Sequence, residues 1–155
     1  MIKINVITNN TAWLNFIKYP INYIDRRIGK INARDRTFSK KDIFCTLLLS
    51  GNKEIKNLNK KFRKKNKSTD VLSFPFQSKK TLQNMLKKKK EIYLGDIIVN
   101  LSQIKCRGNL EKFKSEFDSL WVHGLIHLLG HDHKRDKDFI KMKNLEKRYL
   151  NFING

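Results

Sequence analysis

Cysteine is scarce in this chain of 155 residues, which contains only Cys45 and Cys106, far apart in the sequence. A single distant pair does not form the disulfide framework on which small secreted domains depend. Both side chains are expected to be reduced thiols that pack as small apolar groups. The low cysteine content therefore argues against a disulfide-rich secreted protein and favours a cytoplasmic one.

Long hydrophobic runs are also missing from the sequence. No apolar stretch approaches the roughly 20 residues that a membrane-spanning helix needs. The first ten residues, MIKINVITNN, do not join a long apolar segment to a small-residue cleavage site, so no secretory signal is expected. Both absences predict a cytoplasmic protein with no membrane partner.

Acidic residues are few, because 14 Asp and Glu face 34 Lys and Arg, which gives a formal net charge of +20. Such a positive field favours a polyanionic partner such as RNA or DNA. A second explanation stays open, since Lys, Asn and Ile are also abundant when coding sequence is rich in A and T, and a basic surface promotes solubility. The charge supports a nucleic-acid partner without being sufficient evidence for one.

The apolar content is enough for a packed interior, because 39% of the residues are hydrophobic and 10% are aromatic. A chain of this length fits one domain that buries a sizeable core. No internal repeat or linker interrupts the sequence. We therefore expect a single domain over residues 1–155.

Hydrophobic periodicity predicts strands that alternate with helices. Strands are expected at residues 1–8, 43–49, 71–76 and 93–100. Helices are expected at residues 12–34, divided or started at Pro20, at 53–65, capped by Asn52, at 101–130, with a break near Gly108, and at 136–153. Pro75 restricts the third strand to an edge or an end, and residues 77–91 are expected to form a loop with little helix. This order predicts an α+β fold with one mixed sheet of about four strands and about five helices.

All four histidines lie in the stretch HGLIHLLGHDH, residues 123–133. His123 and His127 are four residues apart, so on a helix they lie on one face, roughly 6 Å apart, and can converge on one metal ion. On the same straight helix His131 would lie about 12 Å from His123 along the axis, whereas zinc needs every nitrogen within about 2.1 Å. A third ligand on that helix is therefore excluded.

Gly130 occupies the position where a helix commonly ends in a left-handed conformation. A chain reversal there would bring His133 back to the first two histidines and leave His131 pointing elsewhere. The spacing H-x-x-x-H-x-x-G-x-x-H is the metzincin pattern with Gly124 in place of the glutamate that serves as general base. Three histidine ligands leave a coordination position open, which indicates a catalytic metal site. Three ordinary core or surface histidines are the less favoured alternative.

Three segments, taken in order, match one family. HGLIHLLGHDH resembles the signature HGxLHLxGYDH, NKKFRKKNKSTDVLSFPF resembles a segment with Asn, Arg and (S/P)TDVLSFP, and LGDIIVN resembles an LGDI strand. Over nearly its whole length the chain resembles the YbeY endoribonucleases, also called rRNA maturation factors. The resemblance implies a zincin-like α+β fold. It also implies a metal-dependent, single-strand-selective endoribonuclease that acts in rRNA maturation, at the small-subunit rRNA 3′ end, and in ribosome quality control.

The resemblance also implies particular residues at the centre of the site. The ligands of one zinc ion per chain fall on His123, His127 and His133, the set that the helical geometry favours, although nickel or manganese suits the same nitrogen ligands. The family's arginine falls on Arg63, where a guanidinium would hold phosphate oxygens and stabilise negative charge. Without the resemblance, Arg63 would be taken as a surface arginine in a basic run.

Four further residues are candidates for substrate binding or for support of the site. Thr69 and Asp70 are expected to fix the strand beside the site, with Asp70 acting more as a brace than as a catalyst. Asp132 would orient a histidine or take up a proton. Asp96 would line the groove or end a turn.

Two features depart from the family pattern. His131 stands where the family usually has Tyr, so an extra metal contact becomes conceivable. Residues 77–91 fill a segment that is often acidic in the family, and Lys87, Lys88, Lys89 and Lys90 would extend an RNA-binding surface or form a solvated loop.

The expected partners are ribosomal RNA and the small ribosomal subunit or its proteins, bound by a monomer or weak oligomer. Two alternatives stay open: a non-enzymatic RNA-binding assembly factor with a structural metal, and a zincin-like metal hydrolase with another substrate. Gly124 argues against the protease version of the latter, because the catalytic glutamate is missing. The sequence decides neither the general base nor whether water or the RNA 2′-OH is the nucleophile.

Overall fold

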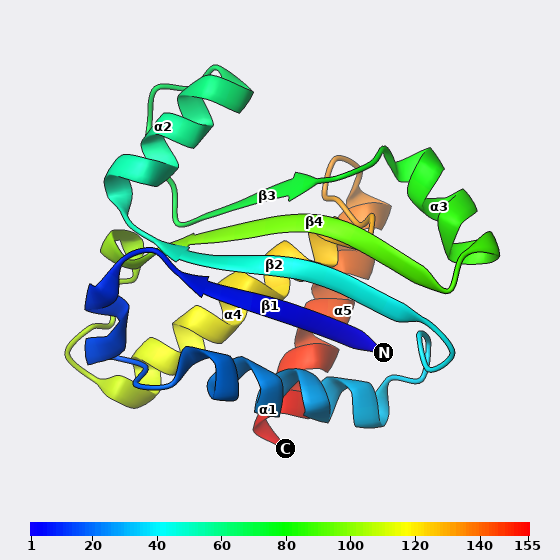
Figure 1. The fold of residues 1–155 in the computed structure, drawn as a ribbon, viewed down its shortest axis with the longest axis horizontal. Helices are drawn as coiled ribbons and strands as arrows, with labels where there is room; N and C mark the ends of the chain where they lie inside the picture. The colour runs from blue at the N-terminus through cyan, green and yellow to red at the C-terminus, as the bar shows by residue number, and fades with distance from the viewer.

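The chain folds as a twisted four-stranded sheet with three long helices packed on one face (Figure 1). The computed structural model describes residues 1–155. The strands are β1 (Ile2–Thr8), β2 (Asp42–Ser50), β3 (Val71–Pro75) and β4 (Glu91–Asn100). The helices are α1 (Pro20–Arg34), α2 (Asn52–Arg63), α3 (Lys79–Lys88), α4 (Leu110–Leu128) and α5 (Asp136–Asn154), with short 3-10 turns at Thr11–Asn15 and Leu101–Gln103. The predicted α+β class, with a mixed sheet of four strands and five helices, is confirmed.

The strand order is β1-β2-β4-β3, which places β2 and β4 in the centre of the sheet. The pairs β1/β2 and β2/β4 are parallel, and β3 pairs antiparallel with β4. Pro75 ends the edge strand β3, as expected for a residue that has no backbone N–H to donate. Strand β3 therefore forms one edge of the sheet, with one of its two sides unpaired.

One face of the sheet carries the core. Helices α1, α4 and α5 cover this face, and a cluster of 29 buried residues fills the space between them and the strands (Figure 1). Only Ile55, Leu72 and Ile98 form a buried cluster on the opposite face, where α2 covers one end. The rest of that face has no helix over it, so the two faces differ in how much apolar surface they bury.

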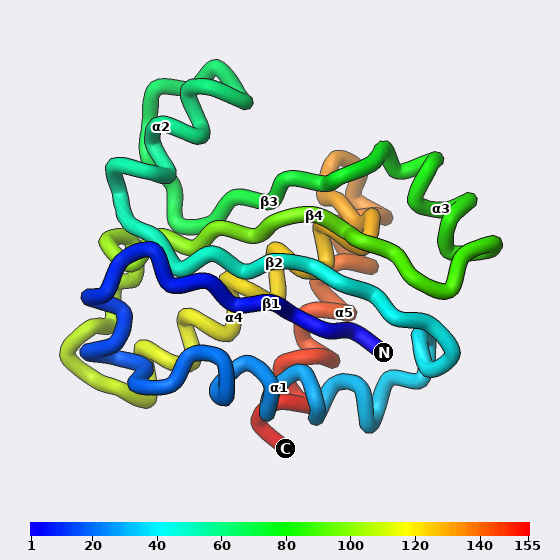
Figure 2. The backbone as a smooth tube through the Cα atoms, in the orientation of Figure 1, coloured from blue at the N-terminus to red at the C-terminus, as the bar shows by residue number.

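The last helix is tied to the first at the end of the chain. Figure 2 shows α5 ending beside α1, where Lys30 Nζ donates to the Ile153 carbonyl at 2.8 Å and Arg34 Nη1 donates to the Phe152 carbonyl at 2.6 Å. These cations satisfy carbonyls of the last helical turn, which have no partner within the helix. No helix of the fold is long and apolar enough to cross a bilayer.

Two predictions about the elements are wrong. Residues 79–88 form helix α3 rather than a loop, because Ser78 caps it by accepting from the Thr81 N–H at 3.2 Å and Leu82 is buried against the core. Asn52 does not cap α2, since Gly51 is the N-cap and Asn52 is the first helical residue. The Asn52 side-chain oxygen instead accepts from Asn100 Nδ2 at 3.0 Å.

Candidate metal centre and substrate cleft

The C-terminal end of α4 reverses the chain within three residues. Gly130 has a φ of 97°, which favours glycine. Its N–H donates to the His127 carbonyl at 3.0 Å, and the His131 N–H donates to the Ile126 carbonyl at 3.2 Å. These are the two hydrogen bonds of a Schellman motif, the left-handed helix ending. The reversal directs the following loop back over the last turns of α4.

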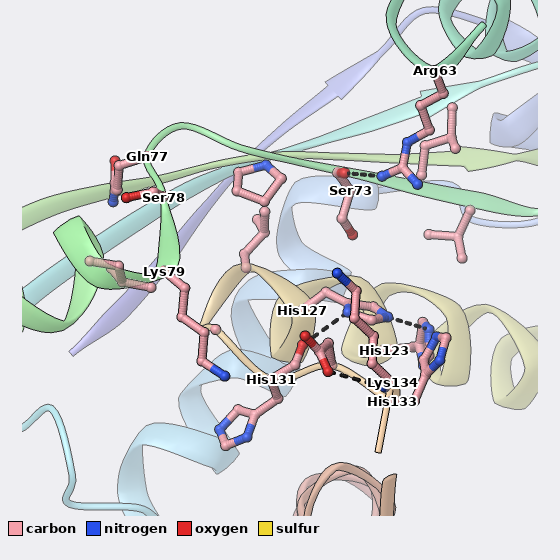
Figure 3. A pocket seen from close by; sticks show the side chains of 17 residues that line it. Arg63, Ser73, Gln77, Ser78, Lys79, His123, His127, His131, His133 and Lys134 are labelled. Atoms are coloured by element: carbon pink, nitrogen blue, oxygen red, sulfur yellow. Dashed lines mark hydrogen bonds between the residues drawn. The ribbon is translucent and has the colours of Figure 1, made fainter. Parts of the chain in front are cut away.

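The reversal brings three of the four histidines together. One nitrogen each of His123, His127 and His133 lies within 4.8 Å of the other two, and the rings converge in Figure 3. The Nε2 atoms of His123 and His127 are 3.0 Å apart. The ring of His131 points away from this cluster in Figure 3. The structure thus places the predicted ligands side by side and leaves His131 outside.

The outer nitrogens of two rings have acceptor partners. His127 Nδ1 lies 3.0 Å from the His131 carbonyl, and His123 Nδ1 lies 2.5 Å from Glu146 Oε1. A carbonyl only accepts, so His127 Nδ1 carries the hydrogen, and the carboxylate favours the same tautomer at His123. Burial lowers the pKa of His127, and the nearby His123 acts in the same direction, so this ring is neutral at neutral pH.

This tautomer assignment fits a metal ion. With the hydrogen on Nδ1, the Nε2 lone pairs of His123 and His127 face one another across 3.0 Å, an arrangement that a cation between them relieves. Nitrogen ligands of a tetrahedral zinc, each at about 2.05 Å, are roughly 3.3 Å apart. Hydrogen bonds from Nδ1 to a carboxylate and to a backbone carbonyl are the usual support for metal-binding imidazoles. The three histidines would hold the metal, and Glu146 would orient His123.

Sequence reasoning missed Glu146. It projects from α5, a helix that packs against α4, and its second carboxylate oxygen lies 3.5 Å from Lys143 Nζ. In the sequence, Glu146 is one of several charged residues in the stretch KNLEKRY, where nothing distinguishes it from solvent-exposed neighbours. Only the packing of α5 on α4 reveals the contact, because the two residues are 23 positions apart.

The glycine that replaces the metzincin glutamate is explained by close packing. A Cβ atom at Gly124 would lie 2.6 Å from Ile97 Cγ2 and 3.2 Å from Ser73 Oγ. The Ser73 hydroxyl donates to the Gly124 carbonyl at 3.2 Å. Helix α4 therefore lies directly on β3 and β4 at this point, where even a methyl group would force Ile97 to shift and a carboxylate general base does not fit.

The three histidines open into a cleft of about 530 Å³ between the end of α4, strand β3 and the start of α3. Its polar lining comprises Arg63, Ser73, Gln77, Ser78, Lys79, His123, His127, His131, Asp132, His133 and Lys134. Three of these side chains are permanent cations and one is an acid. A cleft with this balance suits a polyanionic substrate.

Arg63 forms the wall of the cleft across from the histidines (Figure 3). It is the last residue of α2, where its Nη2 donates to the Ser73 carbonyl at 2.7 Å and its Cζ lies 5.6 Å from the centre of the Phe74 ring. The other guanidinium N–H groups make no hydrogen bond within the protein. They are therefore available to bind phosphate oxygens in pairs.

Asp132 lines the cleft, but its hydrogen bond stays within the loop. Its Oδ1 accepts from the Lys134 N–H at 3.1 Å, and no hydrogen bond joins it to a histidine. The side chain thus shapes the turn between His131 and His133. Any direct role in proton transfer remains a prediction.

Thr69, Asp70 and Asp96 do not line the histidine cleft. Asp70 Oδ1 accepts from the Val71 N–H at 2.8 Å, and the Thr69 carbonyl accepts from Asn100 Nδ2 at 3.1 Å, so both residues lie at the start of β3. Asp96 lies in a second pocket, on the open face of the sheet.

Comparisons with known proteins agree on one family. The family model described as Endoribonuclease YbeY matches residues 16–154. Proteins named Endoribonuclease YbeY are 43% identical in Pelagibacter ubique, covering 99% of this chain and 97% of the relative, and 34% identical in a Wolbachia of Drosophila simulans, covering 97% and 93%. The solution structure of a Thermotoga maritima protein aligns with a TM-score of 0.59 at 25% identity, covering 99% of this chain and 89% of that one. The chain therefore belongs to the YbeY endoribonuclease family.

Proposed function

We propose that this protein is a zinc-dependent endoribonuclease that cuts single-stranded RNA during ribosomal RNA maturation. The observation that carries the proposal is the convergence of His123, His127 and His133 nitrogens within 4.8 Å inside a cleft with a cationic lining. The relatives are named for endoribonuclease activity, which supports RNA as the substrate. The small-subunit rRNA 3′ end, with the small ribosomal subunit as partner, is the proposed place of action.

A zinc ion bound by three imidazoles supplies an open coordination position and a Lewis acid for a phosphodiester. The chain supplies the rest. Glu146 and the His131 carbonyl fix the ring orientations of His123 and His127 through their Nδ1 atoms. This arrangement turns the Nε2 atoms of the two rings towards each other, where they would hold the ion.

Arg63 faces the histidines across the cleft and holds the scissile phosphate with paired N–H groups. Its guanidinium then stabilises the negative charge that develops on the phosphate oxygens in the transition state. Lys79 and Lys134, also in the lining, bind neighbouring phosphates. Because these contacts replace condensed counterions, RNA affinity falls steeply as the salt concentration rises.

Removal of the metal tests the proposal directly. The purified protein should cut a single-stranded oligoribonucleotide, lose this activity with a chelator and regain it when zinc is added. The melting temperature measured in the same samples separates a catalytic metal from a structural one, because loss of a structural metal unfolds many small metal-binding domains. Cleavage that continues undiminished in chelator contradicts the proposal.

The ends of the products identify the nucleophile. Attack by the RNA 2′-OH leaves a 2′,3′-cyclic phosphate, whereas attack by water gives linear phosphate ends. Gly124 has no side chain and is packed closely against Ile97, so the base that activates either nucleophile must come from elsewhere in the cleft. Mass spectrometry of the cleaved oligoribonucleotide distinguishes the two routes.

A further inference from the structure

A second pocket of about 700 Å³ lies on the open face of the sheet, on the other side of β3 from the histidine cleft. We call it the aromatic pocket; its lining is Ile7, Thr46, Leu48, Leu58, Phe62, Phe74, Pro75, Phe76, Gly95, Asp96 and Ile98. Phe62 and Phe76 are 60% and 74% exposed, although burying a phenyl ring is favourable by about 1.5–3 kcal/mol. Exposed rings that flank a pocket are typical of a binding site.

The polar floor of the aromatic pocket depends on a bulge in β4. The pairing of β2 with β4 shifts between Phe44 and Thr46, so that two residues of β4 lie opposite Cys45. One of them is Gly95, which has a φ of 134°. A Cβ atom at this position would lie 2.1 Å from the Phe74 carbonyl oxygen, so no side chain fits. The extra residue turns Asp96 towards the open face, which strict alternation from Tyr93 would not do.

One carboxylate oxygen of Asp96 is a free acceptor in this floor. The Tyr93 hydroxyl donates to its Oδ1 at 2.5 Å and lies 2.8 Å from the Thr46 hydroxyl. Asp96 Oδ2 makes no hydrogen bond within the protein, and Asp96 belongs to no ion pair in a chain of charge +20. An unpaired carboxylate beside aromatic rings accepts hydrogen bonds from N–H groups of a ligand.

The chemistry of this lining matches a nucleobase. Aromatic rings stack on any base, and a carboxylate accepts from exocyclic amino or ring N–H groups. A lone phosphate would be repelled by Asp96. An apolar peptide segment would bury that carboxylate without a partner, which is costly. Lys61 Nζ, 5.3 Å from the Phe62 ring, supplies a cation at the rim for the phosphate attached to the base.

The aromatic pocket adjoins the histidine cleft across β3. Pro75 lines both, and Arg63 lines the cleft while its Cζ lies 5.6 Å from the Phe74 ring of the pocket. A strand of RNA that crosses the short edge strand β3 therefore has a phosphate site on one side and a base site on the other. We propose that the aromatic pocket binds an unpaired base of the same RNA strand whose phosphate lies at the histidines. This inference rests on the proposed function and extends it to recognition of the flanking nucleotide.

Single-stranded oligoribonucleotides with one abasic nucleotide at successive positions test this pocket. With the metal-loaded wild-type protein, one position should lower kcat/KM by about 5- to 150-fold, the range expected for loss of one stacked base. Phe76→Leu keeps the apolar volume but removes the ring. It should cut the intact oligonucleotide with a similar loss, mainly in KM, and should become insensitive to the abasic nucleotide at that one position.

Matched variants sharpen the result. Tyr19 is a 63% exposed aromatic residue with Lys18 Nζ 5.4 Å from its ring, but it lies outside the pocket, so Tyr19→Leu should behave as wild type. Asp96→Asn replaces two acceptor oxygens with one acceptor and one donor. At the sensitive position it should weaken binding of guanine, which donates from both an amino group and a ring N–H, more than binding of uracil, which has only a ring N–H.

Binding of 2′-O-methyl oligonucleotides, followed by fluorescence anisotropy, separates this inference from the proposed function. Cleavage of intact RNA by the wild type reports the function alone, whereas the position-specific effect of Phe76→Leu on binding reports the pocket even if nothing is cut. The inference is overturned if Phe76→Leu binds and discriminates the abasic series as wild type does. It is also overturned if the variant instead abolishes a concentration-dependent dimer, because the occupant is then a second copy of the chain.

Discussion

His123 and His127 project from a part of α4 where Val122, Leu125 and Ile126 are fully buried, whereas Arg63 projects from the exposed last turn of α2. The two walls of the cleft therefore differ in how they hold their functional groups. Packing and Nδ1 hydrogen bonds fix the histidine wall. The arginine wall is held by one hydrogen bond to a carbonyl and by contact with a ring.

The two walls therefore depend on different interactions. The geometry of the histidine wall depends on the hydrophobic core, since α4 lies on the sheet through Gly124. The arginine wall acts through charge near solvent, where salt screens interactions. Substitutions in the first wall should change stability or metal affinity, and those in the second should change the rate and its salt dependence.

The largest effect is expected at the arginine wall. Arg63→Ala should lower kcat by about 100- to 1,000-fold, as removal of one preorganised donor to a developing anion does. Loss of its hydrogen bond to the Ser73 carbonyl should lower the free energy of unfolding by only about 1 kcal/mol. Lys60→Ala removes a cation from the exposed surface of the same helix and should leave kcat nearly unchanged. Single-turnover kinetics over a range of salt concentrations measures both. Equal losses of kcat in the two variants would mean that Arg63 contributes only its positive charge and not a positioned hydrogen-bond donor.

Next in size is the support of the histidine wall. Glu146→Gln should weaken zinc binding by about 10- to 100-fold, because the carboxylate that orients His123 Nδ1 is lost. Glu111→Gln, in the exposed first turn of α4, is the control and should have no effect. Competition with a chromophoric chelator gives both affinities. If Glu146→Gln binds zinc as tightly as wild type, the 2.5 Å contact does not support the site.

A smaller effect should come from the packing behind the histidines. Gly124→Ala should destabilise the fold by about 1–2 kcal/mol, since the clash with Ile97 costs more than the roughly 1 kcal/mol that alanine gains over glycine in a helix. Gly29→Ala, in α1 with open space around the position, should instead stabilise by about 1 kcal/mol. Urea denaturation measures both, and the same sign for the two variants would contradict close packing at Gly124.

The smallest effect concerns the contact between the end of α1 and α5, where Asp35 meets Arg148 and Tyr149. Burial alone would raise the pKa of Asp35, but hydrogen bonds from Thr37 and Tyr149, and the charge of Arg148, hold it below its ordinary value of 3.8. The carboxylate therefore stabilises the fold above that pH, and its contribution disappears as the pH falls through the lowered pKa. Asp35→Asn should lower the free energy of unfolding by about 1 kcal/mol near pH 7 and by less near pH 3, as measured by urea denaturation at the two pH values. If the difference in unfolding free energy between wild type and Asp35→Asn instead grew at low pH, the pKa of Asp35 would not be lowered by folding, which contradicts the prediction.

The local parts of the candidate site could be predicted from the sequence. The spacing of His123 and His127 follows from the helical repeat, and the reversal that returns His133 follows from the left-handed conformation of Gly130. Both depend on neighbours within one or two turns of helix. Local hydrophobic patterns, such as the alternation in residues 1–8 and the apolar run in residues 43–49, likewise predicted all four strands of the sheet.

The remaining parts depend on contacts between distant segments. Glu146 reaches His123 only because α5 packs on α4. The orientation of Asp96 depends on a bulge against β2, and a strict period of two predicts the wrong face. Helix α3 is stabilised by its Ser78 cap and by burial of Leu82, which a polar, lysine-rich stretch does not indicate.

Zinc titration of the wild type, His133→Ala and His131→Ala tests the central claim most directly, because these two histidines belong to the same loop and only one lies in the cluster. The wild type should bind one zinc ion per chain. His133→Ala should lower the affinity by about 100-fold or more, whereas His131→Ala should retain it, since its backbone carbonyl still accepts from His127 Nδ1. Unchanged affinity in His133→Ala, or loss of zinc in His131→Ala, would contradict a site made by His123, His127 and His133.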